Sequence, residues 1–166
     1  TYRPSQLDAI RAVLCQKDSL VVLPTGAGKS LCYQIPTLAA SRIDRSKVFF
    51  TVVVSPLVAL LREQVQCLRE HGIDAVEVTG SISKEQRSQS LSQIVAKDST
   101  LEMLYTTPET LRSKDLICSL QAAYKQGRVF SIAVDEAHCC VQWGHDFRPA
   151  YVDLKNLRNH LPDVPF

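Results

Sequence analysis

Short apolar runs alternate along the chain with longer stretches in which apolar residues recur every three or four positions. The apolar runs have the length of β-strands, and their alternation with helical patterns is typical of a fold in which strands and helices follow one another. The pattern predicts strands at residues 19–23, 50–54, 75–78, 101–106 and 129–134. Several of these runs are apolar almost throughout, as expected when helices cover both faces of a parallel sheet.

Two of the intervening stretches show helical periodicity most clearly. In residues 57–70, a single apolar stripe is formed by Leu57, Leu60, Leu61, Val65 and Leu68. Residues 84–96 are more polar, with an inner face of Leu91, Ile94 and Val95. Breakers stand where the chain should turn, at Pro56, Gly72, Gly80, Pro108 and Gly127. The order predicts a doubly wound α/β fold with a mainly parallel sheet, in which residues 1–166 make one domain.

Composition restricts the classes of protein to which this chain can belong. Of its 166 residues 45% are hydrophobic and 22% are charged, which is typical of a globular domain and excludes wholesale disorder. With 19 basic and 17 acidic residues the formal charge is +2, so bulk electrostatics does not predict binding to nucleic acid. No apolar run has the length of a membrane span, and we expect no membrane partner.

The cysteines and the start of the chain bear on where the protein works. The six cysteines include no pair spaced as Cys-x-x-Cys, and no secretory leader opens the chain, so we expect reduced thiols and an intracellular protein. Its place would be the nucleus in a eukaryote, and otherwise the cytoplasm or nucleoid. Because the sequence begins at Thr1 and its single methionine is Met103, we expect a piece of a longer protein.

A glycine-rich loop lies between the first predicted strand and a helical stretch, with the sequence Leu23-Pro24-Thr25-Gly26-Ala27-Gly28-Lys29-Ser30. Gly26 and Gly28 let the backbone curl until successive N–H groups face phosphate oxygens, and the following helix adds the positive end of its dipole. Lys29 provides a mobile cation for the β- and γ-phosphates, and the Ser30 hydroxyl can ligate Mg²⁺. The loop therefore predicts that the protein binds ATP with Mg²⁺.

Two acidic residues follow the last predicted strand directly, in the sequence Asp135-Glu136-Ala137-His138. Parallel α/β sheets bind their ligands at the carboxyl ends of the strands. Asp135 is expected to hold Mg²⁺, through water, and Glu136 to orient or deprotonate the attacking water. The alternative is a solvated acidic turn before a helix. The phosphate loop upstream in the same alternating fold favours the catalytic interpretation.

Together the two motifs resemble those of superfamily 2 helicases. The strict phosphate-loop pattern begins with Gly, and Leu23 at that position fits the helicase form better than that of kinases or small GTPases. A longer segment narrows the resemblance to the RecQ family of DNA helicases: Trp143-Gly144-His145-Asp146-Phe147-Arg148-Pro149-Ala150-Tyr151. Further RecQ-like pieces are Tyr2-Arg3-Pro4-Ser5-Gln6, Ser55-Pro56-Leu57-Val58-Ala59-Leu60 and Thr107-Pro108-Glu109. The resemblance covers residues 2–151.

The resemblance implies an ATP site with named residues. Catalytic roles fall on Lys29, Asp135, Glu136 and His138, and nucleotide contacts on Arg3, Gln6, Thr25, Gly26, Ala27, Gly28, Lys29 and Ser30, with Ser30 and Asp135 on Mg²⁺. The amide of Gln6, in the adenine-reading motif, can pair with both a donor and an acceptor of adenine. The family also stacks an aromatic residue on adenine, from a position that precedes Thr1.

The same resemblance implies a 3′-to-5′ motor of DNA repair and recombination that acts on single-stranded and partially duplex DNA. Contacts to the DNA backbone fall on Ser55, Thr79, Gly80 and Thr107, whose hydroxyls and backbone amides would fix phosphates without reading sequence. An aromatic-rich loop that senses single-stranded DNA and signals to the ATP site is matched by Trp143, His145, Phe147 and Arg148. A second RecA-like domain of the full-length protein is the implied partner.

This sequence departs from the RecQ pattern at two places. Val141 stands where the family usually has a small hydroxyl residue, so we expect coupling through this loop to differ in detail. The sequence also stops at Phe166, before the expected Ser/Thr-Ala-Thr motif, so we expect weak or no activity of these residues alone. The alternatives are a non-catalytic module that binds ATP and DNA, or another superfamily 2 motor that acts on RNA.

Three clusters also have simpler explanations. Trp143, Phe147 and Tyr151 could be core aromatics, although the polar residues among them favour a loop. A zinc site could be formed by His138, Cys139, Cys140 and His145, but adjacent cysteines rarely ligate one tetrahedral ion. Core positions are the simplest interpretation of Cys32, Tyr33 and Ile35, and Pro36 is expected to kink or end the helix after the phosphate loop.

Overall fold

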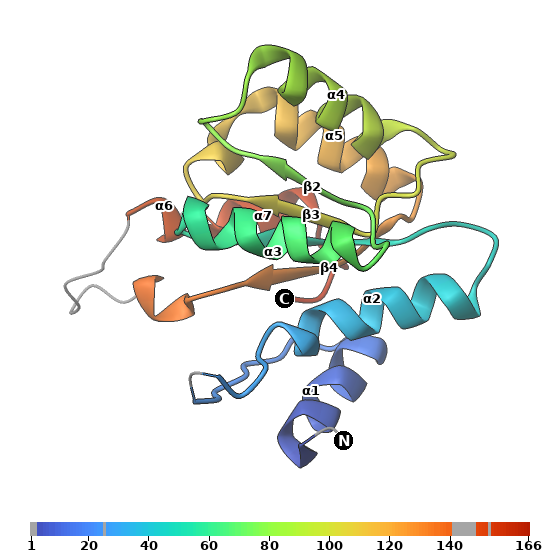
Figure 1. Ribbon diagram of the computed structural model, residues 1–166, viewed down its shortest axis with the longest axis vertical. Coiled ribbons are helices and arrows are strands. Elements are labelled where there is room, and N and C mark those ends of the chain that lie inside the picture. The colour runs from blue at the N-terminus through green and yellow to red at the C-terminus, as the bar shows by residue number, and fades with distance from the viewer. Residues whose placement is uncertain (1–2, 25, 141–148, 153) are drawn as a thin grey trace.

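A four-stranded sheet forms the centre of the protein (Figure 1). The computed structural model describes residues 3–24, 26–140, 149–152 and 154–166. The strands are β1 Phe50–Val54, β2 Ala75–Val78, β3 Met103–Thr106 and β4 Val129–Val134, in the spatial order β2-β3-β1-β4. All three pairings are parallel, which confirms the predicted α/β class. None of the described helices is long and apolar enough to cross a membrane.

The register aligns the carboxyl ends of the four strands. Val54 at the end of β1 pairs with Thr106 of β3 and with Val134 of β4, and Val78 of β2 also pairs with Thr106. The residues that follow each strand therefore gather at one edge of the sheet. In a parallel α/β sheet this is the edge at which ligands bind.

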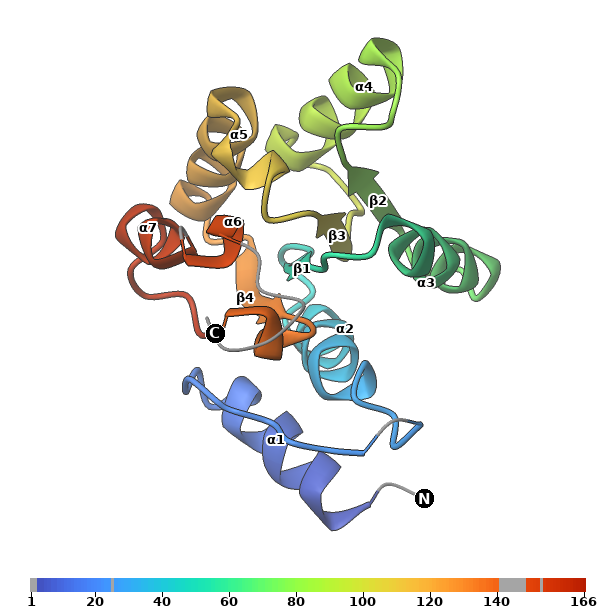
Figure 2. The same ribbon diagram turned by 90° about the vertical axis from the view of Figure 1, so that its left-hand side faces the viewer.

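Helices cover both faces of the sheet, as Figure 2 shows. The helices are α1 Pro4–Leu14, α2 Leu31–Ile43, α3 Val58–Glu70, α4 Lys84–Val95, α5 Lys114–Lys125, α6 Pro149–Val152 and α7 Leu154–His160, with 3-10 turns at Thr110–Arg112 and Ala137–Cys140. Side chains alternate along each strand, so β1 sends Val52 and Val54 to one face and Val53 to the other. Val52 and Val54 pack with residues of α4, α5 and α7, whereas Val53 packs with residues of α3 and with Tyr33 of α2.

One buried cation ties the sheet to the end of α4. Arg128, which precedes β4, is only 2% exposed. Its guanidinium donates to the carbonyls of Ile94 and Ala96 at the end of α4 and to that of Val48 before β1, and it lies 5.6 Å from the ring centroid of Phe50. The last carbonyls of a helix have no partner within the helix, so Arg128 serves as a cap.

The structure corrects two expectations about local elements. Residues 19–23 do not form a strand, and within the described residues their backbone makes one hydrogen bond, from Ser19 N–H to the Phe166 carbonyl at 2.8 Å. Leu20 and Val22 are 85% and 84% exposed. Apolarity alone does not make a strand, because a strand needs a partner for its backbone groups. Of the kink or end expected at Pro36, the end is absent, because α2 continues to Ile43 with Pro36 buried inside it.

Candidate active site

The phosphate loop adopts the backbone conformation that its glycines predict. Gly26 and Gly28 have φ angles of +74° and +76°, in the left-handed region that favours glycine. Ala27 between them is buried, while Lys29 and Ser30 are partly exposed just before α2. Backbone N–H groups at the start of α2 and the helix dipole are thus available to an anion. Thr25 lies outside the described residues.

The amide of Gln6, expected to read adenine, is bonded to the phosphate loop. Gln6 is 5% exposed, and its Nε2 donates to the carbonyls of Ala27 and Gly28 at 2.9 and 3.2 Å. Its Oε1 accepts a hydrogen bond from the backbone N–H of Arg3 at 2.8 Å. A Cβ atom added to Gly28 would lie 2.7 Å from this Nε2. Gln6 therefore fixes the shape of the loop across 22 residues of sequence.

The acidic pair follows β4 at the carboxyl edge of the sheet. Asp135 N–H donates to the Val54 carbonyl at 2.9 Å, which extends the ladder by one residue. Burial raises the pKa of the Asp135 carboxyl, and the charge of Glu136 adds to this, against the opposing effects of the Glu136 backbone N–H, Lys29 and Gln64. Glu136 itself has a φ of +51°, an unusual conformation for a residue with a side chain. Such strain is concentrated at functional sites.

Both motifs line one cavity of about 670 Å³. Its wall includes Lys29, Asp135, Glu136 and His138, together with residues 18–23, part of β4 and the last two residues, 165 and 166. Glu136 Oε2 lies 3.2 Å from Nδ1 of His138. The volume lies within the usual range for small-molecule sites. The structure thus brings together the four residues for which we expected catalytic roles.

In the wall of this cavity lies a network of partly buried polar groups that the sequence pattern does not reveal. Tyr33 of α2 donates to Oε1 of Gln64 on α3 at 3.0 Å and is hydrogen-bonded to Ser30. Gln64 is also hydrogen-bonded to Asp135. Burial raises the pKa of the Tyr33 hydroxyl far above its ordinary value, and that of Tyr105 to about 12. Tyr33 therefore packs against the core, as expected, and its hydroxyl also bonds Ser30 of the phosphate loop.

The residues expected to hold Mg²⁺ fit a hard cation. Ser30 and Asp135 offer oxygen atoms, the ligands that Mg²⁺ prefers. Burial disfavours the charged form of the Asp135 carboxyl and so raises its pKa. A bound cation would favour the charged form again. For the parts of the chain that the structure describes, no group of three or more His, Cys, Asp or Glu residues is placed to hold a metal ion. Four of the cysteines, Cys15, Cys32, Cys67 and Cys118, are free thiols.

The four residues expected to contact the DNA backbone all lie at the carboxyl edge of the sheet, but their exposure differs. Ser55 and Thr79 are 1% exposed and Thr107 is 6% exposed, whereas Gly80 is exposed. The Thr79 hydroxyl is bonded to Ser81 at 3.0 Å and that of Thr107 to Thr110 at 2.9 Å. The Ser55 hydroxyl has no hydrogen-bond partner among the described residues. The surface of these turns is therefore formed less by the predicted hydroxyls than by Gly80 and its neighbours.

Trp143, His145, Phe147 and Arg148, the residues expected in the DNA-sensing loop, lie outside the described residues, as does Val141. The structure does describe the residue at the end of the RecQ-like segment. Tyr151 on α6 is 2% exposed, and its hydroxyl donates to the Asp135 carbonyl at 3.0 Å. This bond joins the segment after the loop to the backbone of the expected Mg²⁺ ligand. The sequence signals this bond only through the presence of an aromatic residue, because 16 residues separate the partners.

Comparison with known proteins agrees with this architecture. The family model described as DEAD/DEAH box helicase matches residues 3–164. The "ATP-dependent DNA helicase Q1" of Rattus norvegicus is 42% identical over 164 residues, which cover 98% of this chain and 25% of that protein. The "ATP-dependent helicase SGS1" of Saccharomyces cerevisiae is 39% identical over 165 residues, covering 99% of this chain and 11% of that protein.

A solved structure shows the same fold. The DUF1998 helicase MrfA bound to DNA and AMPPNP matches with a TM-score of 0.67 at 23% identity, over 81% of this chain and 19% of that one. Fold and site together define a P-loop nucleotide-binding domain of the RecA-like type. More narrowly, the chain belongs to the DEAD/DEAH box helicase family, and its relatives confirm the predicted resemblance to RecQ helicases. It spans about a quarter of the length of the rat relative.

Proposed function

We propose that this chain is the ATP-binding motor domain of a 3′-to-5′ DNA helicase, which hydrolyses ATP to move along single-stranded DNA and to unwind duplexes in DNA repair and recombination. The observation that carries the proposal is the meeting of Lys29 with Asp135 and Glu136 in one cavity of about 670 Å³. Its relatives named as ATP-dependent DNA helicases support the choice of DNA over RNA. Its place would be the nucleus if the organism is eukaryotic, and otherwise the cytoplasm or nucleoid.

The phosphate loop and the acidic motif have distinct tasks in this proposal. The N–H groups of the loop from Thr25 to Ser30 bind the phosphates, and Lys29 binds the β- and γ-phosphate oxygens. Glu136 orients the attacking water and accepts its proton, with His138 3.2 Å from its carboxylate. Mg²⁺, held by Ser30 and Asp135, would neutralise phosphate charge.

Adenine recognition by Gln6 requires an exchange of hydrogen bonds. Both hydrogens of Nε2 are directed at carbonyls of the loop, and Oε1 already accepts from Arg3 N–H. A carbonyl oxygen accepts two hydrogen bonds, so Oε1 can accept from adenine as it stands, but Nε2 must release Ala27 or Gly28 to donate. Nucleotide binding would therefore loosen one tie on the phosphate loop. Arg3, which is exposed, completes the adenine contact in this proposal.

We place the DNA path along the carboxyl edge of the sheet. The turns at Ser55, Thr79, Gly80 and Thr107 would meet the phosphates, with backbone amides in the leading role because three of these side chains are buried. The loop that contains Trp143, His145, Phe147 and Arg148 would stack on bases of single-stranded or partially duplex DNA. A second RecA-like domain would close over the nucleotide and contribute transition-state contacts.

A DNA-stimulated ATPase assay on the natural full-length protein tests this function. Lys29→Ala should abolish hydrolysis and weaken binding of Mg²⁺-ATP, while the matched control Lys125→Ala, at the end of α5, should hydrolyse ATP like the wild type. Wild-type hydrolysis by Lys29→Ala would overturn the assignment of the site. Stimulation by single-stranded RNA in place of single-stranded DNA would instead assign the chain to a motor that acts on RNA.

A further inference from the structure

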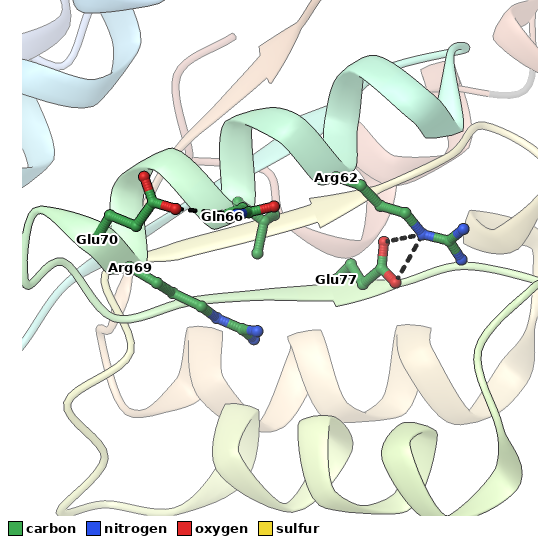
Figure 3. A pocket seen from close by; sticks show the side chains of 6 residues that line it. Arg62, Gln66, Arg69, Glu70 and Glu77 are labelled. Carbon is green, nitrogen blue, oxygen red and sulfur yellow. Dashed lines mark hydrogen bonds and ion pairs between the residues drawn. The ribbon is translucent and has the colours of Figure 1, made fainter.

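One arginine reaches from α3 to the turn after β2. Arg62 lies near the start of α3, and Figure 3 shows its side chain directed at Glu77 of β2. Its Nε is 3.2 Å from both carboxylate oxygens of Glu77, and its Nη2 donates to the Ser81 hydroxyl at 2.8 Å. Two polar groups thus fix the guanidinium, the carboxylate of Glu77 and the hydroxyl of Ser81.

The exposed side of this guanidinium remains available. The Arg62 side chain is 49% exposed, whereas that of Glu77 is 19% exposed. Arginine carries five N–H donors in a planar fork, and Nη1 of Arg62 has no hydrogen-bond partner in the described part of the chain. The Nε of Arg62 is held by the Glu77 carboxylate, while Nη1 is open. Such a guanidinium is suited to bidentate binding of a phosphate.

The position of this fork coincides with the proposed DNA path. Val78, the last residue of β2, pairs with Thr106 of β3, so the turn at residues 79–81 lies at the same sheet edge as the turns after β1 and β3. Thr79 is 1% exposed and its hydroxyl is bonded to Ser81. The polar groups that this turn presents to solvent are therefore those of Gly80 and Ser81, with Arg62 beside them.

We propose that Arg62 and Ser81 form a binding site for a phosphodiester group of single-stranded DNA, and that Glu77 is a positioning residue that holds the Arg62 fork open toward it. This inference rests on the proposed function, because it adds a contact to the same DNA path. It also accounts for the burial of Thr79. The hydroxyl of Thr79 holds Ser81 in place, while Ser81 and Arg62 meet the phosphate.

The test measures single-stranded DNA affinity of the natural full-length protein as a function of salt. Each phosphate contact to a single strand contributes about 0.7 to the slope of log K against log salt concentration. Arg62→Ala should therefore lower the slope by about 0.7 and weaken binding several-fold at low salt. Ser81→Ala should weaken binding less and leave the slope unchanged, because it removes a neutral partner.

Arg69→Ala is the matched control on the same helix. Arg69 lines the same hollow as Arg62 (Figure 3), but its Nε donates at 2.7 Å to the carbonyl of Ala75, the first residue of β2, at the opposite edge of the sheet. Its removal deletes the same charge away from the proposed path, so the salt slope should stay at the wild-type value. Thermal melting of each variant checks that the fold is intact.

Glu77→Gln separates positioning from simple charge. Loss of a negative charge near DNA would by itself tighten binding, whereas loss of the positioning carboxylate weakens it. We expect weaker binding, and unchanged or tighter binding would overturn the role of Glu77. An unchanged slope in Arg62→Ala, or an equal loss in Arg69→Ala, would overturn the Arg62 site and leave the proposed function standing. Absence of DNA binding by the wild-type protein would instead count against the proposed function.

Discussion

Replacement of Gly28 by alanine tests how tightly the phosphate loop is tied to α1. The φ of Gly28 is +76°, and an added Cβ would lie 2.7 Å from Nε2 of Gln6. Gly26 has nearly the same φ, +74°, but an added Cβ there meets no heavy atom of the described structure within 4 Å. The two glycines therefore form a natural pair, in which one substitution introduces backbone strain alone and the other introduces strain and a collision.

The expected costs follow from these two geometries. A left-handed conformation costs a residue with a side chain about 1–2 kcal/mol, which is the full effect expected for Gly26→Ala. In Gly28→Ala the amide of Gln6 must also move away from the carbonyls of Ala27 and Gly28, and each lost hydrogen bond costs about 1 kcal/mol net. The free energy of unfolding should therefore fall by about 3–4 kcal/mol in Gly28→Ala.

A double-mutant cycle assigns the difference to Gln6. In the wild-type background Gln6→Ala should lower the free energy of unfolding by about 2–3 kcal/mol, since it removes the two bonds to the loop and the bond from Arg3 N–H. In the Gly28→Ala background the same change should cost only about 1 kcal/mol, because the bonds to the loop are already broken and only the bond from Arg3 N–H to Oε1 is left to lose. Urea denaturation measures the four stabilities, and titration with a fluorescent ATP analogue and Mg²⁺ reports whether the loop still binds phosphate.

Two results would refute this reasoning. Equal destabilisation by Gly26→Ala and Gly28→Ala would show that the contact with Gln6 carries no cost. An equal effect of Gln6→Ala in both backgrounds would show that Gln6 and Gly28 are independent, and that the two hydrogen bonds do not shape the loop.

Three further predictions concern the acidic pair and the buried arginine. Glu136→Gln should keep Mg²⁺-ATP binding but lower turnover by about 10²–10⁴-fold, and collapse of its ATP affinity would make Glu136 a binding residue. Glu136→Gly should in addition raise the free energy of unfolding by about 1 kcal/mol, because the φ of +51° costs glycine nothing. Because the folded-state pKa of Asp135 is raised, its charge destabilises the fold above that pKa, so Asp135→Asn should raise the melting temperature at neutral pH without Mg²⁺. That gain should vanish as the pH falls to the unfolded-state pKa, and a constant gain at all pH values would contradict the assignment. Arg128→Met should lower the free energy of unfolding by about 2–4 kcal/mol by leaving buried carbonyls unpaired, as urea denaturation would show; an unchanged midpoint would contradict its capping role.

The hydrophobic pattern predicted most of the sheet and failed where partners decide the structure. The bounds of β1, β2 and β4 are those predicted, and β3 begins two residues later than residue 101. Residues 19–23 are as apolar as a buried strand, yet the sequence cannot show whether a neighbour faces their backbone. Pro36 was predicted to kink or end the helix and does not end it, because burial of Pro36 in the packed α2 outweighs the hydrogen bond that proline cannot donate.

The site was predictable where the functional residues are close together in the sequence. Gly26 and Gly28 need positive φ, and the structure has it; Asp135 and Glu136 follow a buried strand, and the structure places them in the cavity with Lys29. Contacts between distant side chains were not predictable. The bond from Gln6 to Ala27 spans 21 residues and that from Tyr33 to Gln64 spans 31. Such pairs arise from packing, which no spacing along one chain expresses.

Helix α3 contributes one residue that is bonded to the wall of the nucleotide cavity and another to the proposed phosphodiester site. Arg62 and Gln64 are two residues apart, which places them about 200° apart around the helix axis, on opposite faces. Gln64 is hydrogen-bonded to Tyr33 and to Asp135 at the nucleotide cavity, while Arg62 faces the turn after β2. A rotation or shift of α3 on binding a phosphodiester at Arg62 would therefore displace the partner of the Asp135 carboxylate. In the proposed function, α3 would therefore link the two sites, and this link is one route by which DNA binding would act on ATP hydrolysis.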